Sequence, residues 1–229
     1  MRELPILMNG PMVRAVLDGR KTVTRRIVKL PHHNPLGSWE PTTIGGRDAG
    51  GFVHPEQAAI WHTRTGEVLT CPYGQPGDRL WVRETHMRVP HPSEFGLTRE
   101  MLPHTWDACC EVAGTFLYRA DPCSDLAADG RRWTPSIHMP RAASRITLEV
   151  TGVRVELLQD ISEADALAEG IDNEMCRASL GKAPLKAGYL PTCAFSYLWD
   201  QINGAGSWDA NPWVWSIEFR RIEQEGMAA

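Results

Sequence analysis

Apolar residues in the N-terminal part of the chain predict a strand followed by a helix. Residues 5–8 form a short apolar run, and the apolar residues after it recur at helical spacing. Asn9 is a suitable cap for this helix, with Pro11 in its first turn and Gly19 just past its end. The cationic segment GRKTVTRR follows at once, and its position after a helix end predicts a loop.

Further along the chain, β-rich or alternating runs predict three more strands. Residues 79–84 follow a Pro-Gly-Asp turn, and residues 212–222 combine aromatic and β-branched side chains. The clearest alternation lies at 144–158, where Gly152 indicates a bend or a bulge. These runs are the main evidence for a sheet.

Two helices are expected between the strands at 144–158 and 212–222. Ser162 is a good N-cap for a short helix that ends at Gly170, and Ile161 is placed to pack against its first turn. A second helix is expected at 194–202. Strands and helices together predict an α+β fold, a mixed sheet in the form of a small open β-barrel with flanking helices.

Two regions, 31–71 and 86–131, lack this periodicity. The first is rich in Gly, Pro and His, and in the second only residues 115–120 predict a strand. Long irregular stretches inside a compact domain are usually functional or inserted. We therefore expect a single domain over 1–229 with two long loop-rich insertions.

Composition places the chain among ordinary globular proteins. Its 229 residues are 42% hydrophobic and 23% charged. No apolar run approaches the roughly 20 residues of a membrane span, and the first apolar segment is too short for a signal peptide. We expect a cytoplasmic protein without membrane contact. The 6 cysteines form no Cys-x-x-Cys pair, which favours reduced thiols over a zinc site, so no metal or cofactor is expected.

The formal net charge of −4 hides two cationic stretches. Residues 1–39 hold seven cations against two acids, and residues 131–148 hold four arginines and no acid. Such stretches suit a local anionic ligand, a nucleotide or a short single-stranded RNA, whereas binding of long duplexes usually needs a basic domain. A solvated cationic face is the alternative.

Lys21 and Thr24 are the first candidates for chemistry. Arg20, Arg25 and Arg26 flank Lys21, and neighbouring cations or burial would lower its pKa towards that of a general base. On an ideal strand, positions 21 and 24 point to opposite faces, so Lys21 can activate the Thr24 hydroxyl only from a turn or loop. Alternatively, Lys21 is an exposed surface lysine and Thr24 an ordinary strand or turn residue.

Glu169 stands where a carboxylate is poorly placed. It falls in the last turn of the predicted short helix, against the helix dipole, and Asp165 lies one turn earlier. Both effects would raise its pKa, which suits proton transfer. A solvated surface glutamate is the alternative. Glu84, at the end of a predicted strand, is a pocket carboxylate or an exposed strand end, and we favour the second.

Four blocks in this order resemble the ASCH-domain family of the PUA-like superfamily. They are GRKTVTRR, PGDRLWVRE, ITLEVTGVRVELLQDISEADALAEGI and PWVWSIEF, and they cover about half of the chain. The longer form, with insertions at 31–71 and 86–131, is similar to ASCH proteins of bacteriophages and prophages. The resemblance implies a small β-barrel with flanking helices, a cleft for RNA or a nucleoside, and a cytoplasmic location in a bacterial host or an infected cell.

One bacterial branch of this family hydrolyses N4-acetylcytidine to cytidine and acetate with a Lys, a Thr and a Glu. Its Lys and Thr lie in a G-R-K-T-x-T segment, which matches Lys21 and Thr24. Its Glu follows the long strand, and the matching segment LQDISEADALAE ends at Glu169. The resemblance thus implies an amidohydrolase in which Lys21 takes a proton from Thr24, Thr24 attacks the acyl carbon, and Glu169 protonates the leaving amine.

Other routes and functions remain open at this point. Water can attack directly while Thr24 only orients the substrate. Other family members bind or cut single-stranded RNA, so the alternatives are a non-catalytic RNA or modified-base binding module and a single-stranded ribonuclease. The insertions add Trp39, Trp61, Trp106 and Trp133, which would suit a larger substrate. The expected substrate-binding residues are Arg20, Thr22, Arg25, Arg26, Glu84, Arg141 and Arg145.

Overall fold

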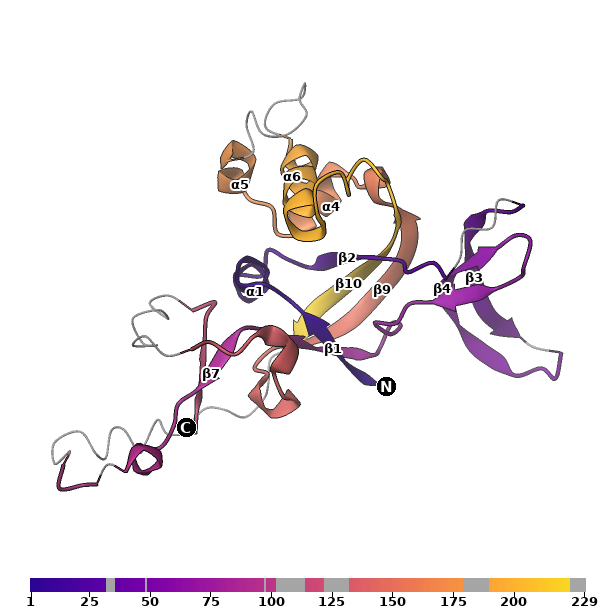
Figure 1. Ribbon diagram of the computed structural model, residues 1–229. Coiled ribbons are helices and arrows are strands. Elements are labelled where there is room, and N and C mark those ends of the chain that lie inside the picture. Colours follow the sequence, from indigo (N-terminus) through magenta and orange to yellow (C-terminus); the bar gives the residue numbers. More distant parts are fainter. Residues whose placement is uncertain are drawn as a thin grey trace. The chain divides into compact units, whose positions relative to one another are not determined.

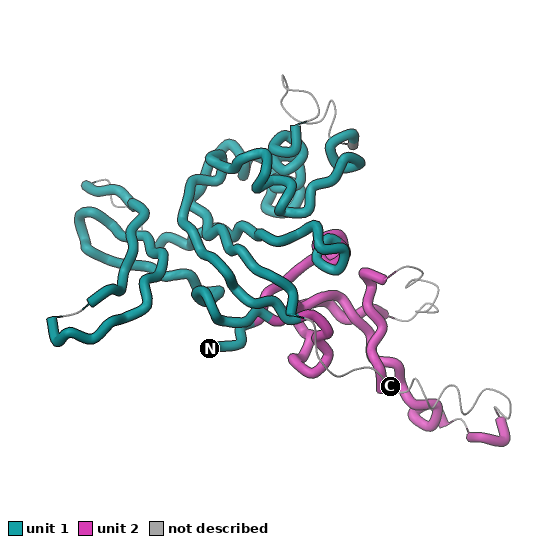
Figure 2. The backbone as a smooth tube through the Cα atoms, turned by 180° about the vertical axis from the view of Figure 1, so that it is seen from behind, with its two compact units in different colours: residues 1–4, 15–80, 147–229 teal, residues 5–14, 81–146 magenta. Residues whose placement is uncertain are grey.

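The computed structural model describes residues 1–31, 36–47, 49–96, 98–101, 114–121, 132–178 and 190–222. The chain divides into two compact units (Figure 2). Unit 1 comprises residues 1–4, 15–80 and 147–229, and unit 2 comprises residues 5–14 and 81–146. Helices and strands occur together, as the predicted α+β class requires. The single domain with two insertions stays a prediction.

Five strands form the largest sheet. In spatial order they are β1 (Glu3–Leu7), β6 (Arg79–Arg83), β9 (Thr147–Leu157), β10 (Trp213–Ile222) and β2 (Val23–Ile27). Figure 1 shows β10 between β9 and β2, and both pairings are antiparallel. β1 and β2 are the two edges, so the described strands form an open sheet that is not closed into a barrel.

The sheet contains the bulge that Gly152 predicted. Gly152 pairs with Glu218, but the next pair is Val150 with Phe219, so the β9 strand carries one extra residue here. A Cβ atom at Gly152 would come within 2.7 Å of the Glu218 carboxylate. The glycine therefore also allows this cross-strand side chain to lie close to β9.

The described helices are α1 (Gly10–Leu17), α4 (Glu163–Ala168), α5 (Asn173–Ala178) and α6 (Pro191–Asn203). The last three lie together in unit 1 (Figure 1). Their apolar sides form one core with the ends of β9 and β10, which includes Leu158, Ala166, Phe195, Trp199 and Val214. This packing stabilises the short α4, which is too short to be stable alone.

Local capping signals were predicted correctly. Asn9 Oδ1 accepts the Met12 N–H at 3.0 Å, and Ser162 Oγ accepts the Asp165 N–H at 3.1 Å. Gly19 and Gly170 both have positive φ, as residues that end helices often do. The helix α5 was not predicted, although Asp172 Oδ1 accepts the Met175 N–H at 2.8 Å and marks its start.

The prediction of a loop-rich region at 31–71 is wrong. Most of it forms a three-stranded antiparallel sheet of β3 (Trp39–Arg47), β4 (Val53–His62) and β5 (Val68–Thr70). The glycines that suggested a loop serve a bulge instead: the register shifts after Ile44, and a Cβ at Gly45 would lie 2.4 Å from the Pro55 carbonyl oxygen. Only glycine permits this close approach. In the sequence, however, a glycine that serves a bulge cannot be distinguished from one that serves a turn.

Unit 2 contains a second small sheet. Its strands are β7 (His86–Arg88) and β8 (Phe116–Tyr118), and β8 confirms the strand expected at 115–120. Short 3₁₀ helices occupy Pro92–Phe95, Ser136–His138 and Arg141–Ala143, and in unit 1 another occupies Leu158–Asp160. Trp106 and Arg131 lie outside the described residues, as do Cys109, Cys110 and Cys123.

None of the described helices has the length and apolar character needed to cross a membrane.

Candidate active site

The segment between α1 and β2 is a turn held against the end of α4. The Lys21 N–H donates to the Ala15 carbonyl at 2.9 Å, which closes the turn after the helix. The Thr22 N–H donates to the Ala168 carbonyl at 2.8 Å, and Lys21 forms an isolated antiparallel bridge with Glu169. Lys21 therefore precedes the strand, and its side chain need not follow strand alternation. The prediction of a loop holds for residues 19–22 but is wrong for residues 23–26, which pair with β10 as part of β2.

This turn brings Lys21 and Glu169 into direct contact. The Lys21 amine donates to the Glu169 main-chain oxygen at 2.9 Å and forms an ion pair with carboxylate oxygen Oε2. Lys21 is 2% exposed and Glu169 6% exposed. The alternatives of a surface lysine and a solvated surface glutamate are therefore wrong.

Burial also decides the protonation chemistry of Lys21. Desolvation lowers the pKa of the Lys21 amine, and the positive charges of Arg26 and Arg25 lower it further. The charge of Glu169 and its hydrogen bond oppose this effect, but the pKa stays below its ordinary value. A lysine in this state gives up its proton more readily than an exposed lysine, as a general base must.

Thr24 lies in the same buried region on β2. The N–H of Arg25 donates to Glu169 Oε1 at 2.7 Å, so the peptide that joins Thr24 to Arg25 lies against the Glu169 carboxylate. Thr24 pairs with Ile217 of β10 and is 0% exposed. Within the described part of the chain, its hydroxyl oxygen has no hydrogen-bond partner. An unpaired buried hydroxyl is costly, which is why such groups often have a functional reason.

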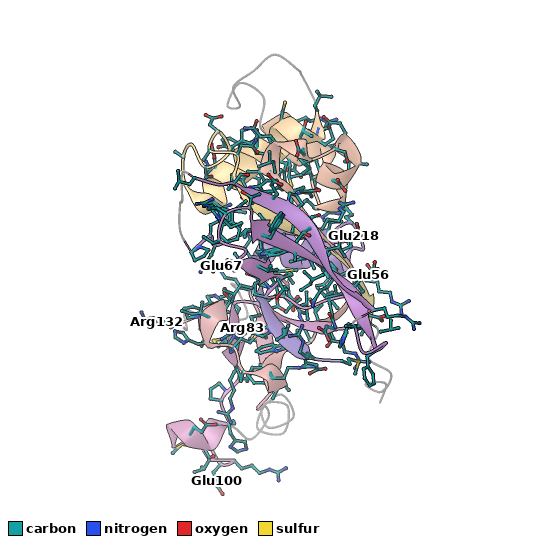
Figure 3. The ribbon with its side chains drawn as sticks, turned by 90° about the vertical axis from the view of Figure 1, so that its right-hand side faces the viewer. Glu56, Glu67, Arg83, Glu100, Arg132 and Glu218 are labelled. Atoms are coloured by element: carbon teal, nitrogen blue, oxygen red, sulfur yellow. The ribbon has the colours of Figure 1, made fainter. Side chains whose placement is uncertain are left out.

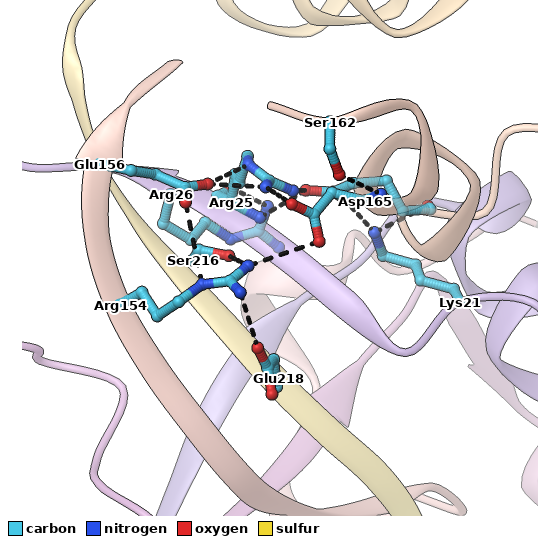
Figure 4. Close-up of polar contacts among 10 residues, drawn as sticks. Lys21, Arg25, Arg26, Arg154, Glu156, Ser162, Asp165, Ser216 and Glu218 are labelled. Atoms are coloured by element: carbon cyan, nitrogen blue, oxygen red, sulfur yellow. Dashed lines mark hydrogen bonds and ion pairs between the residues drawn. The ribbon is translucent and has the colours of Figure 1, made fainter. Parts of the chain in front are cut away.

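Arg25 does not present its guanidinium group to solvent. Its side chain is 0% exposed and lies beside the carboxylates of Glu156 and Asp165 (Figure 4) and of Glu169. The expected role of Arg25 in substrate binding is therefore at odds with its surroundings. A buried guanidinium needs acids beside it: Nε donates to Glu156, while Nη1 and Nη2 lie within ion-pair distance of acids but make no hydrogen bond among the described residues.

Three other predicted binding residues lie at the surface of this turn or close to it. Arg20 donates to the Gly170 carbonyl at 3.0 Å and pairs with Asp18 at 3.0 Å. Thr22 is exposed, and Arg26 is half-buried, with its guanidinium 3.3 Å from the Arg25 carbonyl. These side chains remain candidates for contact with a ligand.

The remaining predicted binding residues belong to unit 2. Glu84 is buried, so the favoured interpretation of an exposed strand end is wrong. Arg145 forms a two-pronged pair with it at 2.9 and 3.1 Å and also pairs with Asp121. Burial raises the pKa of Glu84, although the hydrogen bonds and charge of Arg145 oppose the shift. This arrangement is that of a structural ion pair.

Arg141 and Arg83 lie near the Trp81 ring in unit 2. Their guanidinium carbons are 6.0 and 5.5 Å from its centroid, which is cation–π geometry. Figure 3 labels Arg83 and the exposed Arg132. By contrast, Trp215 of unit 1 is buried in the core.

Sequence reasoning missed the carboxylates and the second arginine around Arg25. Arg154 and Glu156 lie two residues apart on β9. The Arg154 guanidinium lies 3.4 Å from the Asp165 carboxylate and 3.2 Å from the Glu218 carboxylate (Figure 4). Charged residues two apart on a strand share a face, and this was the available signal. Asp165 was treated only as a repulsive neighbour of Glu169, because its pairing with Arg25 joins distant parts of the chain.

The described residues include no group of three or more His, Cys, Asp or Glu side chains placed to hold a metal ion. Among the described cysteines, Cys71, Cys176 and Cys193 are free thiols, and burial raises the pKa of Cys71 to about 11. A protonated buried thiol is a poor nucleophile.

Comparisons of the chain with protein-family models, with curated proteins and with solved structures find no match.

Proposed function

We propose that this protein hydrolyses an amide on a modified pyrimidine nucleoside or nucleotide, with N4-acetylcytidine as the model substrate. The observation that carries the proposal is the Lys21–Glu169 pair, which lies against the peptide following Thr24, a buried threonine whose hydroxyl has no hydrogen-bond partner among the described residues. A lysine with a lowered pKa, a carboxylate and an available hydroxyl are the groups that acyl transfer needs.

The proposed reaction uses these groups in two stages. Neutral Lys21 accepts the Thr24 proton as the Thr24 oxygen bonds to the acyl carbon, and the carbon–nitrogen bond breaks as Glu169 delivers a proton to the leaving amine. Water then attacks the acyl carbon of the acyl-threonine as Glu169 takes a proton from it, the carbon–Thr24 oxygen bond breaks as Lys21 returns its proton to Thr24, and acetic acid is released, which restores neutral Lys21 and protonated Glu169. Direct attack by water, with Thr24 as a hydrogen-bonding group, uses the same residues.

The depth of the site sets a requirement for this chemistry. Lys21, Thr24 and Glu169 are all buried, so a substrate reaches Thr24 only after side chains around the site move aside. The exposed Thr22 and Arg20 are on the turn that carries Lys21, which makes this turn the natural place for the opening.

The proposal extends to the family. The blocks that resemble ASCH proteins contain Lys21, Thr24 and Glu169, and their proximity supports membership of this PUA-like group, including its bacteriophage and prophage members. The small β-barrel of that group is part of the proposal, with the open sheet β6-β9-β10-β2 as its counterpart here. A cytoplasmic location follows from the same resemblance.

One observation favours a second candidate, a module that binds RNA or a modified base without chemistry. The Lys21, Arg25 and Glu169 side chains are buried and paired with one another, as in a structural ion network. In that case the half-buried Arg26 and the exposed Arg20 and Thr22 would contact the ligand. The same experiment separates the two candidates.

The test is chromatographic detection of cytidine after incubation of the purified protein with N4-acetylcytidine. Lys21→Met and Glu169→Gln should abolish release, whereas Lys29→Met, a change of an exposed lysine on the same segment, should leave it intact. Release by the unchanged protein but equally by Lys21→Met would refute the mechanism. If nothing is released, but single-stranded RNA is bound and recovered intact, the binding module is correct, and cleaved RNA would identify a ribonuclease.

A further inference from the structure

Both the main chain and the side chain of Arg25 lie against the Glu169 carboxylate. Its N–H donates to Glu169 Oε1 at 2.7 Å, and its guanidinium Nη1 lies 3.5 Å from the same oxygen. The other carboxylate oxygen, Oε2, pairs with the Lys21 amine. The two oxygens of Glu169 thus have separate partners. Oε1 is held by the hydrogen bond from the Arg25 N–H and by the nearby charge of the guanidinium, whose Nη1 makes no hydrogen bond among the described residues.

The guanidinium of Arg25 is itself held on two further sides. Its Nε donates to Glu156 Oε1 at 2.8 Å, and its Nη2 lies 3.1 Å from Asp165 Oδ2. Glu156 is on β9 and Asp165 is on α4, so Arg25 of β2 connects three elements of unit 1. A planar group with several fixed donors can do this, whereas a lysine amine cannot match the same geometry.

The charge of Arg25 also offsets the repulsion between Asp165 of α4 and Glu169, which follows the last residue of that helix. Asp165 and Glu169 are one helical turn apart, where like charges repel. The Arg25 guanidinium lies within ion-pair distance of both carboxylates, and its positive charge offsets their repulsion. A second arginine, Arg154, pairs with Asp165 from the outside, where its side chain is 46% exposed, and it has no described contact with Glu169.

From these contacts we infer that Arg25 is a positioning residue, which holds the Glu169 carboxylate with Oε2 directed at Lys21 and does not itself bind the substrate. The effect of this positioning on catalysis rests on the proposed hydrolysis. One consequence does not depend on that reaction: Arg25 is a cation fixed beside the Lys21–Glu169 pair, so its charge should add to the effect of burial in lowering the pKa of Lys21.

The test compares Arg25→Met with Arg154→Met as a matched control. Both changes remove an arginine that pairs with Glu156 and Asp165, but only Arg25 contacts Glu169. The first readout is NMR titration of the lysine amine nitrogens. The chain contains only four lysines, so Lys21 can be assigned by comparison with Lys21→Met. The Lys21 titration should move to higher pH in Arg25→Met and stay in place in Arg154→Met.

The second readout is catalysis. Arg25→Met should lower kcat by up to about 100-fold, the loss expected when a catalytic group is misplaced by about 1 Å, with little change in KM. The rise of kcat with pH should move upward with the Lys21 titration, which a purely structural role would not cause. A raised KM with unchanged kcat would identify Arg25 as a substrate-binding residue and overturn the inference.

Arg25→Met leaves buried acids without their arginine and could prevent folding, so a second variant is needed. If the variant does not fold, Arg25→Met is combined with Asp165→Asn and compared with Asp165→Asn alone. An upward shift of the Lys21 titration in this comparison supports the inference, and no shift overturns it. If the protein releases no cytidine but the titration shifts, the proposed function fails while the positioning of the pair by Arg25 stands. If cytidine is released but neither titration nor kcat responds, the positioning role fails alone.

Discussion

At the scale of single residues, Lys21 and Thr24 occupy environments that cost stability. The Lys21 amine is buried and its pKa is lowered, and the Thr24 hydroxyl is buried without a described partner. A fold selected for stability alone would replace these groups with apolar side chains. Lys21 pairs with the Glu169 carboxylate and the peptide after Thr24 donates to it, and this combination is the residue-scale argument for a functional site.

Replacing Thr24 by valine tests this argument without reference to activity. The change removes a hydroxyl that makes no described hydrogen bond and keeps the branched shape. We expect the free energy of unfolding to rise by about 1 kcal/mol, because an unpaired buried polar group carries a desolvation cost. Urea denaturation measures this difference. Thr22→Val, at an exposed position on the same turn, should change stability by less than about 0.5 kcal/mol.

A loss of stability above about 1 kcal/mol in Thr24→Val would show that the hydroxyl is hydrogen-bonded after all. The same variant should lose hydrolysis of N4-acetylcytidine entirely if Thr24 is the nucleophile. Gain of stability with loss of activity is the pattern that a strained functional residue produces.

At the scale of elements, the site depends on how the end of α4 meets the turn before β2. Gly170 ends α4 with φ of 94°, and a Cβ there would lie 2.8 Å from the Ala15 Cβ and 3.3 Å from the Lys21 Cβ. The glycine therefore provides both the left-handed backbone and the space that lets Lys21 approach Glu169.

Gly170→Ala should accordingly lower the free energy of unfolding by about 2–4 kcal/mol, from left-handed backbone strain and from the steric clash. Gly19→Ala is the matched control, because Gly19 also has positive φ but a Cβ there would meet nothing within 4 Å. That variant should lose only the backbone component, about 1 kcal/mol. Equal losses in the two denaturation curves would contradict the proposed close packing at Gly170.

At the scale of the whole molecule, each compact unit contains an arginine paired with acids, buried in unit 1 and half-buried beside a buried glutamate in unit 2. Arg25 serves unit 1, and Arg145 serves unit 2 through Glu84 and Asp121. Such pairs add little net stability, but removing one partner leaves a buried charge alone. We therefore expect Arg145 to matter for the folding of unit 2, where its guanidinium also lies 3.9 Å from the centre of the Tyr118 ring.

Arg145→Met should lower the free energy of unfolding by about 3–5 kcal/mol near neutral pH. Burial already raises the pKa of Glu84, and loss of Arg145, which opposes that shift, should raise it further. A carboxyl whose pKa is higher in the folded state destabilises the fold only while it is ionised. The deficit should therefore be largest above the folded pKa of Glu84 and shrink as the pH falls towards about 4.

Denaturation of Arg145→Met and the unchanged protein at a series of pH values measures this dependence. Arg132→Met, at an exposed arginine of the same unit, should differ from the unchanged protein by less than about 0.5 kcal/mol throughout. A deficit that stays constant with pH would mean that lost packing, and not the charge of Glu84, explains the effect.

Local signals in the sequence determined most of the elements near the site. Asn9 and Ser162 each predicted the start of a helix, and the alternation at 144–158 predicted the long strand β9. Caps and periodicity depend on residues within a few positions of each other, so they can be read from the sequence. The segment GRKTVTRR and Glu169 were also marked from sequence as the places where charge breaks the local rules.

Tertiary structure alone decided what these residues contact. Sequence reasoning treated Asp165 as a neighbour that repels Glu169, whereas folding inserts Arg25 between them, and it expected a loop where Gly45 allows β3 and β4 to pair across a bulge. The burial of Lys21, and hence its lowered pKa, likewise arises from elements distant in the chain. Desolvation and pairing depend on three-dimensional neighbours, so the sequence could identify the charged groups, but only the fold could assign their partners.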